Sequence, residues 1–566
     1  MSQKKSFPHE ISVVLCGEAG QGIQTIEHAL TRILKEDGFY TFSTSEFMSR
    51  IRGGVNSTTI RVAGKPVNCY AEKIDILIAL NSLAVGHLEK RIDNETIVIG
   101  PPDYVSELSG AIAVDFSAIA AEAGSKLYAN TVAAGFLACL FSAAPEAVEN
   151  YIRERFAAKD EKVIEGNITA ARAGAEAAEA LADRVSIEFV RAGKAIGTSR
   201  ITDGAEAVAL GAIAGGCDFV SSYPMSPSTG VLINMAQRSH KAGILVEQAE
   251  DEIAAINMAL GAWYAGARAL VTTSGGGFAL MCEGVSLAGM LETPVVVHIG
   301  QRPGPATGLP TRTEQGDLDL ALYAGHGEFP RIILAPGSPE QAFKLAAHAF
   351  NMADKYQIPV FILTDQYLLD SHYQINEFNN DGFQIERHIV KTAPDYKRYA
   401  LHDSGISPRG IPGYGEGIVA VDSDEHTEEG YITESMQVRN AMMRKRLAKL
   451  PALRKESIAP EITGPADAAN VVICWGSNYH QVQEAIEKTG RKDIAMLHFS
   501  QVYPLPENTA ALLGKAGQKI IIENNATGQF ERLLKIETGL TCDKHIRSFD
   551  GLPFAVETIA QELAEV

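Results

Sequence analysis

The first part of the chain alternates between apolar runs and helix-type patterns. Residues 11–38 read ISVVLCGEAGQGIQTIEHALTRILKEDG, in which a β-branched run is followed by glycines and then by apolar residues at helical spacing. Shorter apolar runs at 74–80 and 96–100 have the composition of strands buried in a parallel sheet. The alanine-rich, charged stretch at 143–194 predicts terminal helices. We therefore predict a first α/β domain over residues 1–190.

A second alternating pattern starts near Ile201. Strand-type runs here are separated by helix-length segments: CDFVSSYP, RALVTTSGGG, TPVVVHIGQR, PRIILAPGS and IPVFILTDQYL. This order is typical of a doubly wound parallel sheet, which binds ligands at the carboxyl ends of its strands. We predict a second domain over residues 198–372.

The remaining sequence divides into a polar stretch and a third alternating region. Residues 373–460 contain the turn-rich segments GIPGYGEGI and DSDEHTEEG before a basic helix-type stretch, which predicts a connecting arm. In residues 461–566 the runs NVVICWGS, AMLHFSQVYPLP and QKIIIENNATGQF predict three more strands with helices between them. The predicted fold class is α/β, with three open parallel-sheet domains.

Charge and cysteine content narrow the possible partners. The 566 residues carry 50 Lys plus Arg and 69 Asp plus Glu, a net charge of −19 that would repel a nucleic-acid backbone. The sequence has neither a secretory apolar segment nor a long apolar run, so we expect a cytoplasmic protein that does not bind a membrane. The seven cysteines are scattered, which argues against an iron–sulfur cluster on this chain.

Glycines follow the first predicted strand. Gly17, Gly20 and Gly22 lie where exposed N–H groups and a helix N-terminus favour an anion, so they could cradle a phosphate. The spacing is GxxGxG and not the dinucleotide fingerprint GxGxxG. A tight turn without a ligand explains these glycines equally well.

A second glycine-bearing loop contains cations and small polar residues. Arg50 and Arg52 precede two glycines and the polar run Asn56–Thr59. An anionic ligand could bind there. A solvated loop leading into the next strand is the simpler explanation of the same residue types.

The segment Tyr223–Thr229, YPMSPST, follows a predicted strand. Its two prolines fix a rigid loop at the end of an open sheet where ligands bind, so its hydroxyl groups could face a crevice. Alternatively, Ser228 or Thr229 caps the helix that follows.

An acidic segment precedes a helix of small residues. Residues 246–252, VEQAEDE, contain Glu250 and Glu252, and most of these carboxylates should simply favour a helix N-terminus. One of them could instead be kept desolvated against the apolar helix, with a raised pKa suited to proton exchange.

Two further loops could approach a ligand. Ser274 ends a predicted strand, and Gly275 begins a run of three glycines directly after it. The glycines could let the backbone approach a ligand closely, or they could form an ordinary surface turn. The Gly/Pro-rich loop 301–315 holds Arg302 and Arg312, either of which could clamp a carboxylate. A structural salt bridge of Arg312, with Glu314 or Asp317 for example, is the alternative.

Together these stretches resemble the 2-oxoacid:ferredoxin oxidoreductases, in particular the two-subunit type whose alpha subunit carries an N-terminally fused gamma domain. The resemblance covers nearly the whole chain. Its most specific signals are YPMSPST, similar to the family's YPITPST, then AEDEIAAINMALGAWYAGARALVTTSGGG and QRPGPATGLPTRTEQGDL. GEAGQG and RIRGG resemble segments of the family's gamma domain. The match implies a gamma domain, a thiamine-diphosphate pyrimidine-binding domain and a transketolase C-terminal-like domain.

The resemblance also implies roles for individual residues. It makes Glu252 the carboxylate that contacts the cofactor's aminopyrimidine, in preference to Glu250, because Gly261 then falls where related thiamine enzymes place a helix glycine. It implies that Ser226 contacts the substrate, although the family usually has threonine there. The other implied contacts are Tyr223, Pro224, Ser274 and Gly275 for the cofactor, Thr229 and Arg312 for the substrate, and Gly17, Gly20, Gly22 and Arg52 for coenzyme A or another anion.

The chain lacks a GDG motif with a distal asparagine pair for binding diphosphate through Mg²⁺. The family carries this motif and a [4Fe–4S] cluster on a beta subunit, so the resemblance implies a heterodimer that reduces ferredoxin. It further implies oxidative decarboxylation of 2-oxoglutarate with coenzyme A, Arg312 binding the distal carboxylate. Specificity for pyruvate or a branched-chain 2-oxoacid, or a non-catalytic subunit that binds a nucleotide, are the alternatives.

Overall fold

The computed structural model describes residues 5–49, 54–188, 190–465 and 467–566. The chain forms two compact units, each of which is described by itself. Unit 1 consists of Met1–Thr202, Ser371–Glu377 and Ala555–Glu557; unit 2 consists of Asp203–Asp370, Phe378–Phe554 and Thr558–Val566.

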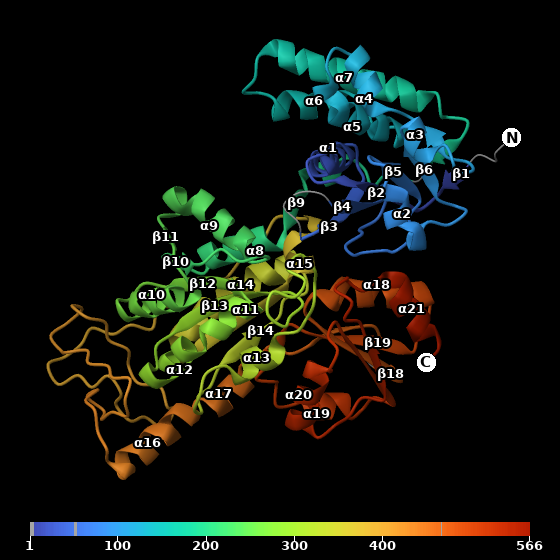
Figure 1. Cartoon of the computed structure of the whole chain (residues 1–566). Coiled ribbons are helices and arrows are strands. Elements are labelled where there is room, and N and C mark those ends of the chain that lie inside the picture. Colours follow the sequence, from blue (N-terminus) through green and yellow to red (C-terminus); the bar gives the residue numbers. More distant parts are fainter. Residues whose placement is uncertain (1–4, 50–53, 189, 466) are drawn as a thin grey trace. The chain divides into compact units, whose positions relative to one another are not determined.

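Unit 1 is built on an eight-stranded sheet (Figure 1). In sheet order its strands are β7 (Ile112–Ala113), β6 (Ile97–Gly100), β5 (Ile76–Ala79), β2 (Glu10–Glu18), β4 (Val55–Ala63), β3 (Tyr40–Glu46), β16 (His372–Ile375) and β9 (Arg200–Asp203). Strands β7, β6, β5 and β2 are parallel, whereas β4 is antiparallel to both β2 and β3, and β16 is antiparallel to β3. A separate parallel pair is formed by β1 (Lys5–Phe7) and β8 (Val185–Ile187).

Helices cover both faces of this sheet. Apolar residues of α1 (Ile23–Glu36) and α5 (Ala129–Leu140) form one core with the strands, which α4 (Phe116–Glu122) joins. The short helices α2 (Ala84–His87) and α3 (Pro102–Val105) pack on the other face. Outside α1 and α5 lie α6 (Pro145–Arg155) and α7 (Glu161–Glu179), which bury a further apolar cluster (Figure 1).

The main sheet of unit 2 is almost entirely parallel. In sheet order it consists of β11 (Leu245–Gln248), β10 (Phe219–Ser222), β12 (Ala269–Ser274), β13 (Val295–Gln301), β15 (Pro359–Asp365), β14 (Ile332–Leu334) and β20 (Gln501–Tyr503). Every residue of β12, β13 and β15 is buried, as expected of strands covered on both faces. Only the edge strand β20 runs antiparallel.

Eight helices accompany this sheet. They are α8 (Gly204–Ala214), α9 (Thr229–Ala242), α10 (Glu252–Tyr264), α11 (Gly275–Leu280), α12 (Cys282–Leu291), α13 (Leu318–Tyr323), α14 (Pro339–Tyr356) and α15 (Gln366–Asp370). Helices α9, α10 and α11 each follow the carboxyl end of a strand, so their N-termini meet at one edge of the sheet, where open α/β sheets bind ligands.

The predicted connecting arm is anchored by buried charges rather than being a solvated linker. Its irregular part leads to α16 (Met436–Leu447) and α17 (Leu450–Lys455). Glu292, at the end of α12, forms buried ion pairs with Lys445 at 2.5 Å and Lys449 at 2.7 Å. Because two lysines share this one carboxylate, removing Glu292 would leave two buried ammonium groups unpaired, which is strongly destabilising.

A second open sheet in unit 2 is formed by the C-terminal residues. Its strands are, in order, β17 (Glu461–Thr463), β19 (Ile494–Phe499), β18 (Asn470–Trp475), β21 (Gln518–Glu523) and β22 (Lys544–Arg547). They are parallel except for β17. The helices are α18 (Tyr479–Thr489), α19 (Thr509–Leu513), α20 (Gln529–Thr538) and α21 (Val556–Ala564).

The predicted α/β fold with three open sheets is confirmed, with one correction. The sheet of unit 1 is mixed, because β4 pairs with β2 and β3 in antiparallel register. Two strands that lie close in sequence can form a hairpin-like pair, and the apolar runs alone gave no sign of strand direction. The domain boundaries stay a prediction.

Candidate functional site

The structure brings most of the predicted site residues to one edge of the main sheet of unit 2. The segment after β10, the glycine turn after β12 and the loop after β13 leave adjacent strands of the sheet, and α10 begins close to the end of the neighbouring β11. Contacts between these segments, described below, define a site around Glu252 and the Gly275–Gly277 turn.

Glu252 is the first residue of α10, and its carboxylate is buried. Its exposed fraction is 3%, whereas Glu250 is exposed. Asp251 caps the helix through a hydrogen bond from the Ala254 N–H to its side chain, at 2.7 Å. Glu252 Oε1 has no hydrogen-bond partner among the described residues. A buried oxygen of this kind is costly unless something hydrogen-bonds to it, so this atom is placed to meet a ligand.

The Gly275–Gly277 turn is shaped to make room for this carboxylate. A methyl group placed on Gly277 would clash with Glu252 Oε1 and with the Thr273 hydroxyl. A methyl group on Gly275 would clash with both carboxyl oxygens of Asp317. Gly276 differs, because the nearest atom to an added methyl group is 3.9 Å away. Two glycines of the turn are therefore required by acidic side chains.

The YPMSPST loop contacts the same turn. The Ser274 hydroxyl lies 2.6 Å from the Met225 sulfur, and the Ser226 carbonyl accepts a hydrogen bond of 2.7 Å from Arg302. Ser226 itself is exposed. Ser228 is fully buried, and its hydroxyl donates to the Met225 carbonyl at 2.7 Å. The alternative in which Ser228 caps α9 through its side chain is wrong, since that hydroxyl closes the loop instead.

A polar relay missed by the sequence analysis crosses the strands below the site. His298 on β13 is fully buried between the hydroxyls of Thr272 at 2.7 Å and Thr364 at 2.8 Å. Burial lowers the pKa of His298 to about 3, so the ring is neutral. One ring nitrogen donates and the other accepts, which satisfies both atoms and fixes adjacent strands. In the sequence, the sign of this relay was the presence of two threonines and one histidine in otherwise apolar strands.

The loop that carries Arg312 is held at both ends by buried amides. Gln301 donates to the Thr364 carbonyl at 3.1 Å and accepts from the Asp317 N–H at 3.0 Å. Gln315 donates to the Trp475 carbonyl at 2.8 Å, which ties the loop to the C-terminal sheet. Arg312 lies half-buried between these anchors, with its stem against Gly551. A side chain on a loop fixed in this way is pre-organised for binding.

Asp317, at the end of this loop, was considered from the sequence only as a salt-bridge partner. It begins α13 but makes no side-chain cap, and its buried Oδ2 has no hydrogen-bond partner in the part of the chain that the structure describes. Burial and the nearby charge of Glu314 raise the pKa of Asp317 to about 7, opposed in part by Arg302. The site thus holds two carboxyl groups with unmatched buried oxygens.

The glycine turn of unit 1 has a different character. Gly20 and Gly22 have positive φ angles of 90° and 80°, which glycine adopts without strain. The Gln21 side chain accepts a hydrogen bond of 2.6 Å from the Glu18 N–H, and it occupies the space beside Gly17. A methyl group on Gly22 would clash with Asn130. Arg52, also predicted as an anion ligand, lies outside the described residues.

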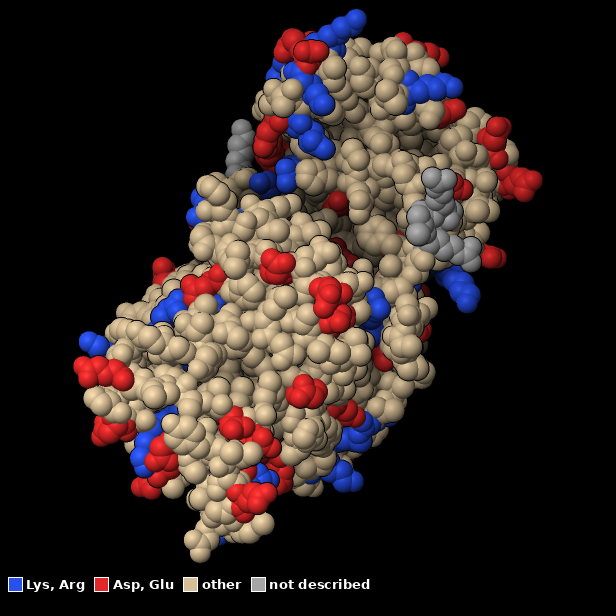
Figure 2. All heavy atoms as spheres, turned by 60° about the vertical axis from the view of Figure 1, so that its left-hand side comes forward, with Lys and Arg blue, Asp and Glu red and all other residues tan. Residues whose placement is uncertain are grey.

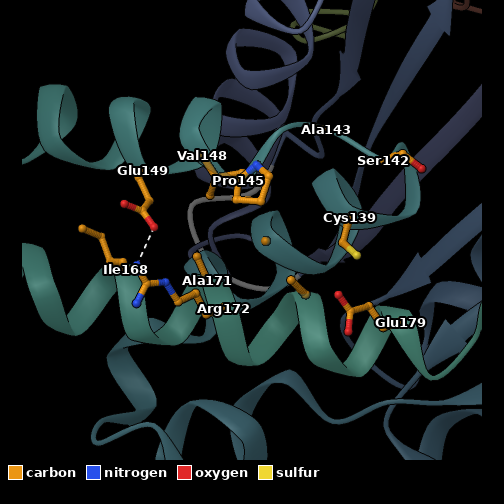
Figure 3. A pocket seen from close by; sticks show the side chains of 12 residues that line it. Cys139, Ser142, Ala143, Pro145, Val148, Glu149, Ile168, Ala171, Arg172 and Glu179 are labelled. Atoms are coloured by element: carbon orange, nitrogen blue, oxygen red, sulfur yellow. Dashed lines mark hydrogen bonds and ion pairs between the residues drawn. The ribbon is translucent and has the colours of Figure 1, made fainter.

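Unit 1 also contains a pocket between α5, α6 and α7 (Figure 3). Its volume is about 190 Å³, its floor is mainly apolar, and the Arg172–Glu149 ion pair of 2.5 Å bridges two of its helices. Burial raises the pKa of the Cys139 thiol in its wall, which leaves this sulfur protonated and weakly nucleophilic. None of the predicted site residues lines this pocket.

Metal ligands and membrane-spanning helices were both sought in the described parts of the chain. These parts contain no cluster of three or more His, Cys, Asp or Glu side chains suited to holding a metal ion. No described helix is long and apolar enough to cross a membrane.

Comparison with known proteins identifies the family. Residues 210–445 match the thiamine-diphosphate-binding domain model of pyruvate flavodoxin/ferredoxin oxidoreductases, and residues 12–177 match the pyruvate ferredoxin/flavodoxin oxidoreductase model. A 2-oxoacid:ferredoxin oxidoreductase alpha subunit from a Sulfolobus species is 32% identical over 98% of this chain and 97% of its own length. The chain belongs to the 2-oxoacid:ferredoxin oxidoreductase family.

Two further relatives agree with this assignment. The 2-oxoglutarate oxidoreductase subunit KorA of Mycobacterium tuberculosis is 28% identical over 93% of this chain and 87% of its own length. A solved 2-oxoglutarate:ferredoxin oxidoreductase from Magnetococcus marinus, with 2-oxoglutarate, coenzyme A and succinyl-CoA bound, is 30% identical. It superposes with a TM-score of 0.92, covering 99% of this chain and 100% of that one. The resemblance inferred from YPMSPST and its companion motifs is confirmed, and this oxidoreductase subunit is part of an enzyme.

Proposed function

We propose that this chain supplies the pyrimidine-binding side of a thiamine-diphosphate site and, together with a beta subunit, converts 2-oxoglutarate and coenzyme A to succinyl-CoA and CO2 while reducing ferredoxin. The observation that carries the proposal is the buried Glu252 carboxylate, whose Oε1 has no partner among the described residues and lies against Gly277, where an added methyl group would clash with it. The match of residues 210–445 to a thiamine-diphosphate-binding domain supports it.

The residues around Glu252 fit this cofactor. Glu252 Oε1 is free to bind a ring N–H group of an aminopyrimidine, and the Gly275–Gly277 turn lets the chain approach a flat ring closely. Tyr223 and Pro224 would line the ring, and Ser274 would complete the contact. When bound, thiamine diphosphate supplies the electron sink for decarboxylation. Glu252 would hold the aminopyrimidine in the tautomer that this chemistry needs.

The beta subunit is expected to cover an apolar face around α10. Large apolar side chains are exposed on α9, β11, α10 and α11: Ile233 at 50%, Leu245 at 63%, Ile253 at 49%, Met258 at 41% and Leu280 at 52%. Figure 2 shows wide uncharged areas between separate charged residues on this side of the molecule. Extended apolar areas of this kind mark protein interfaces.

This interface would also complete the cofactor site. The chain lacks a diphosphate-binding motif, so the beta subunit would bring Mg²⁺, the diphosphate ligands and a [4Fe–4S] cluster that passes electrons to ferredoxin. The chain's own contribution would end at the pyrimidine and the substrate.

Arg312 is proposed to bind the distal carboxylate of 2-oxoglutarate, with Ser226 and Thr229 as further substrate contacts. An arginine on an anchored loop can form a paired hydrogen bond with a carboxylate. The 2-oxoglutarate-bound structure from Magnetococcus marinus and the name of the Mycobacterium relative support a dicarboxylic substrate. Coenzyme A is proposed to bind near Gly17, Gly20, Gly22 and Arg52.

The test is 2-oxoglutarate-dependent and coenzyme-A-dependent reduction of a viologen dye. We expect the chain alone to be inactive, and the chain co-expressed with its beta subunit to be active. Activity of the isolated chain would overturn the split site. A complex that reduces the dye with pyruvate or a branched-chain 2-oxoacid, but not with 2-oxoglutarate, would overturn the substrate.

The Arg312→Leu variant tests the substrate contact in the same complex. Losing a charge-assisted pair to the distal carboxylate should raise KM for 2-oxoglutarate by about tenfold to 100-fold, since a charged hydrogen bond contributes about 1.5–3 kcal/mol. KM for 2-oxobutyrate, which lacks that carboxylate, should change little. Unchanged 2-oxoglutarate kinetics would remove Arg312 from the site.

A further inference from the structure

The carboxyl group of Asp317 has no part in the function proposed above, yet it is held firmly in place. Its backbone N–H donates to Gln301 at 3.0 Å, and its carbonyl accepts from the Ala321 N–H at 2.9 Å in the first turn of α13. Gln301 is itself fixed to Thr364 on β15. The side chain therefore has a set position at the sheet edge.

The surroundings of Asp317 mainly disfavour its charged form: burial and Glu314 raise its pKa, and only Arg302 opposes them. Its buried Oδ2 has no hydrogen-bond partner among the described residues. Arg302, the nearest influential cation, donates to the Ser226 carbonyl instead. A buried carboxylate without donors is unstable as an anion and favours the neutral acid. The proton on this acid is then a donor without an acceptor.

Asp317 and Glu252 approach the same glycine turn from two sides. Gly275 leaves room for Asp317, and Gly277 leaves room for Glu252. Asp317 also ends the loop that carries Arg312. Asp317 and Glu252 therefore both lie against the first glycines of α11, where the cofactor is proposed to bind.

The charge of the substrate decides what such a group can do. A 2-oxoacid is an anion at neutral pH, so an ionised Asp317 would repel it, whereas a protonated Asp317 can donate a hydrogen bond to one of its oxygens. We infer that Asp317 binds the 2-oxoacid in its protonated form, as a hydrogen-bond donor to the substrate's carboxylate. This inference rests on the proposed function.

Binding of the 2-oxoacid is then linked to protonation of Asp317. Burial is the main cause that raises the pKa of Asp317 to about 7; Glu314 raises it further and Arg302 lowers it. Below that pH the acid is already protonated, and the affinity for the substrate is independent of pH. Above it, a proton must be taken up with the substrate, so KM should rise up to tenfold per pH unit.

The experiment follows KM of the alpha–beta complex for 2-oxoglutarate from pH 6 to pH 9. Asp317→Asn keeps the shape and a donor N–H but cannot titrate, so its KM should stay flat above pH 7 where that of the unaltered complex climbs. Glu314→Gln removes a negative charge that raises the Asp317 pKa, so the rise should start at a lower pH. Asp317→Asn that keeps the full pH dependence of KM would overturn the inference.

A binding measurement provides a readout besides turnover. Glutarate, a dicarboxylate that lacks the reacting carbonyl, is titrated into the complex by calorimetry in two buffers of different ionisation enthalpy at pH 8. The unaltered complex should take up close to one proton per glutarate, and Asp317→Asn close to none. Equal proton uptake in both would overturn the inference and leave the proposed function intact. A complex inert with every 2-oxoacid would overturn both.

Discussion

The glycine turns of unit 1 and unit 2 look alike in the sequence but differ in what their glycines accommodate. Each lies where a buried strand gives way to a helix: GEAGQG runs from the end of β2 to the residue before α1, and in SGGG Ser274 ends β12 while the glycines begin α11. In unit 1 the space beside Gly17 and Gly22 is occupied by the side chains of Gln21 and Asn130. In unit 2 the corresponding neighbours of Gly275 and Gly277 are the carboxyl groups of Asp317 and Glu252.

The difference lies in hydrogen bonding. The Gln21 amide already accepts from the Glu18 N–H, so the first turn satisfies itself. The carboxyl groups at the second turn each keep a buried oxygen without a partner among the described residues. A strand, glycine and helix pattern therefore predicts a tight turn in both cases. Unsatisfied acidic side chains are what distinguish a candidate ligand site from a packing turn.

The largest effect that would test this contrast is loss of the Glu252 charge. Glu252→Gln keeps the shape of the side chain but removes its negative charge, so viologen reduction by the complex should fall by about 100-fold to 10,000-fold, the range for a lost proton-handling group. The matched control is Glu250→Gln, which alters an exposed carboxylate two residues away and should keep nearly full activity. Similar losses in both variants would contradict the assignment of Glu252.

A methyl group on the turn of unit 2 should have the next largest effect. Gly277→Ala would displace Glu252 and Thr273, and we expect about tenfold to 100-fold lower activity because small displacements of a site residue are costly. The concentration of thiamine diphosphate needed for half-maximal activity should rise as well. Gly276→Ala is the control, since its methyl group meets no atom closer than 3.9 Å. Equal behaviour of the two variants would show that the turn tolerates a side chain.

Substitutions in the glycine turn of unit 1 should lower the stability of the protein and leave its kinetics with the 2-oxoacid unchanged. Gly22→Ala combines a positive φ angle of 80° with a clash against Asn130, and should destabilise the fold by about 1–3 kcal/mol. Gly20→Ala carries only the φ strain, because its methyl group would meet open space, and should destabilise less. Thermal unfolding measures both. A raised KM for coenzyme A in Gly20→Ala, at nearly normal stability, would instead support a phosphate cradle.

Much of the fold and part of the site could be predicted from the sequence. Short runs rich in valine and isoleucine, such as VVVHIG, identified the buried parallel strands, because their length and β-branched residues favour a strand over a buried helix. The prolines of YPMSPST after a strand predicted a rigid loop at the ligand-binding edge of a sheet, whereas the role of Glu252 came from the family resemblance. The direction of β4 could not be predicted, because it depends on pairing between strands and not on local pattern.

The remaining site residues depended on tertiary contacts. Nothing local distinguishes Asp317 from an ordinary helix cap, since its burial comes from Gly275 in another segment. Residues 373–460 were predicted only as a connecting arm, because the pattern of their lysines and arginines does not show which of them are buried. Their partners, such as Glu292 for Lys445, lie more than a hundred residues away in the chain.

The last expected effect is gradual, a change in stability with pH at Asp317. Folding raises the pKa of the Asp317 carboxyl group from 3.8 to about 7. The folded state is therefore most stable when this group is protonated, and it loses stability as the pH rises. Stability should therefore fall between about pH 4 and pH 7 and level off above, where the group is ionised in both states. The full penalty is at most about 4 kcal/mol, at 1.36 kcal/mol per pKa unit.

Asp317→Asn removes this penalty, so the free energy of unfolding of the variant should exceed that of the unaltered chain by an amount that grows from pH 4 to pH 7. Urea unfolding at pH 4.5, 6 and 8 measures the difference. Glu250→Gln alters an exposed carboxylate and should show no such growth. A constant difference across this range would mean that Asp317 titrates like an exposed acid. The glycine turn of unit 2 would then have one unsatisfied carboxyl group fewer and would be more like the turn of unit 1.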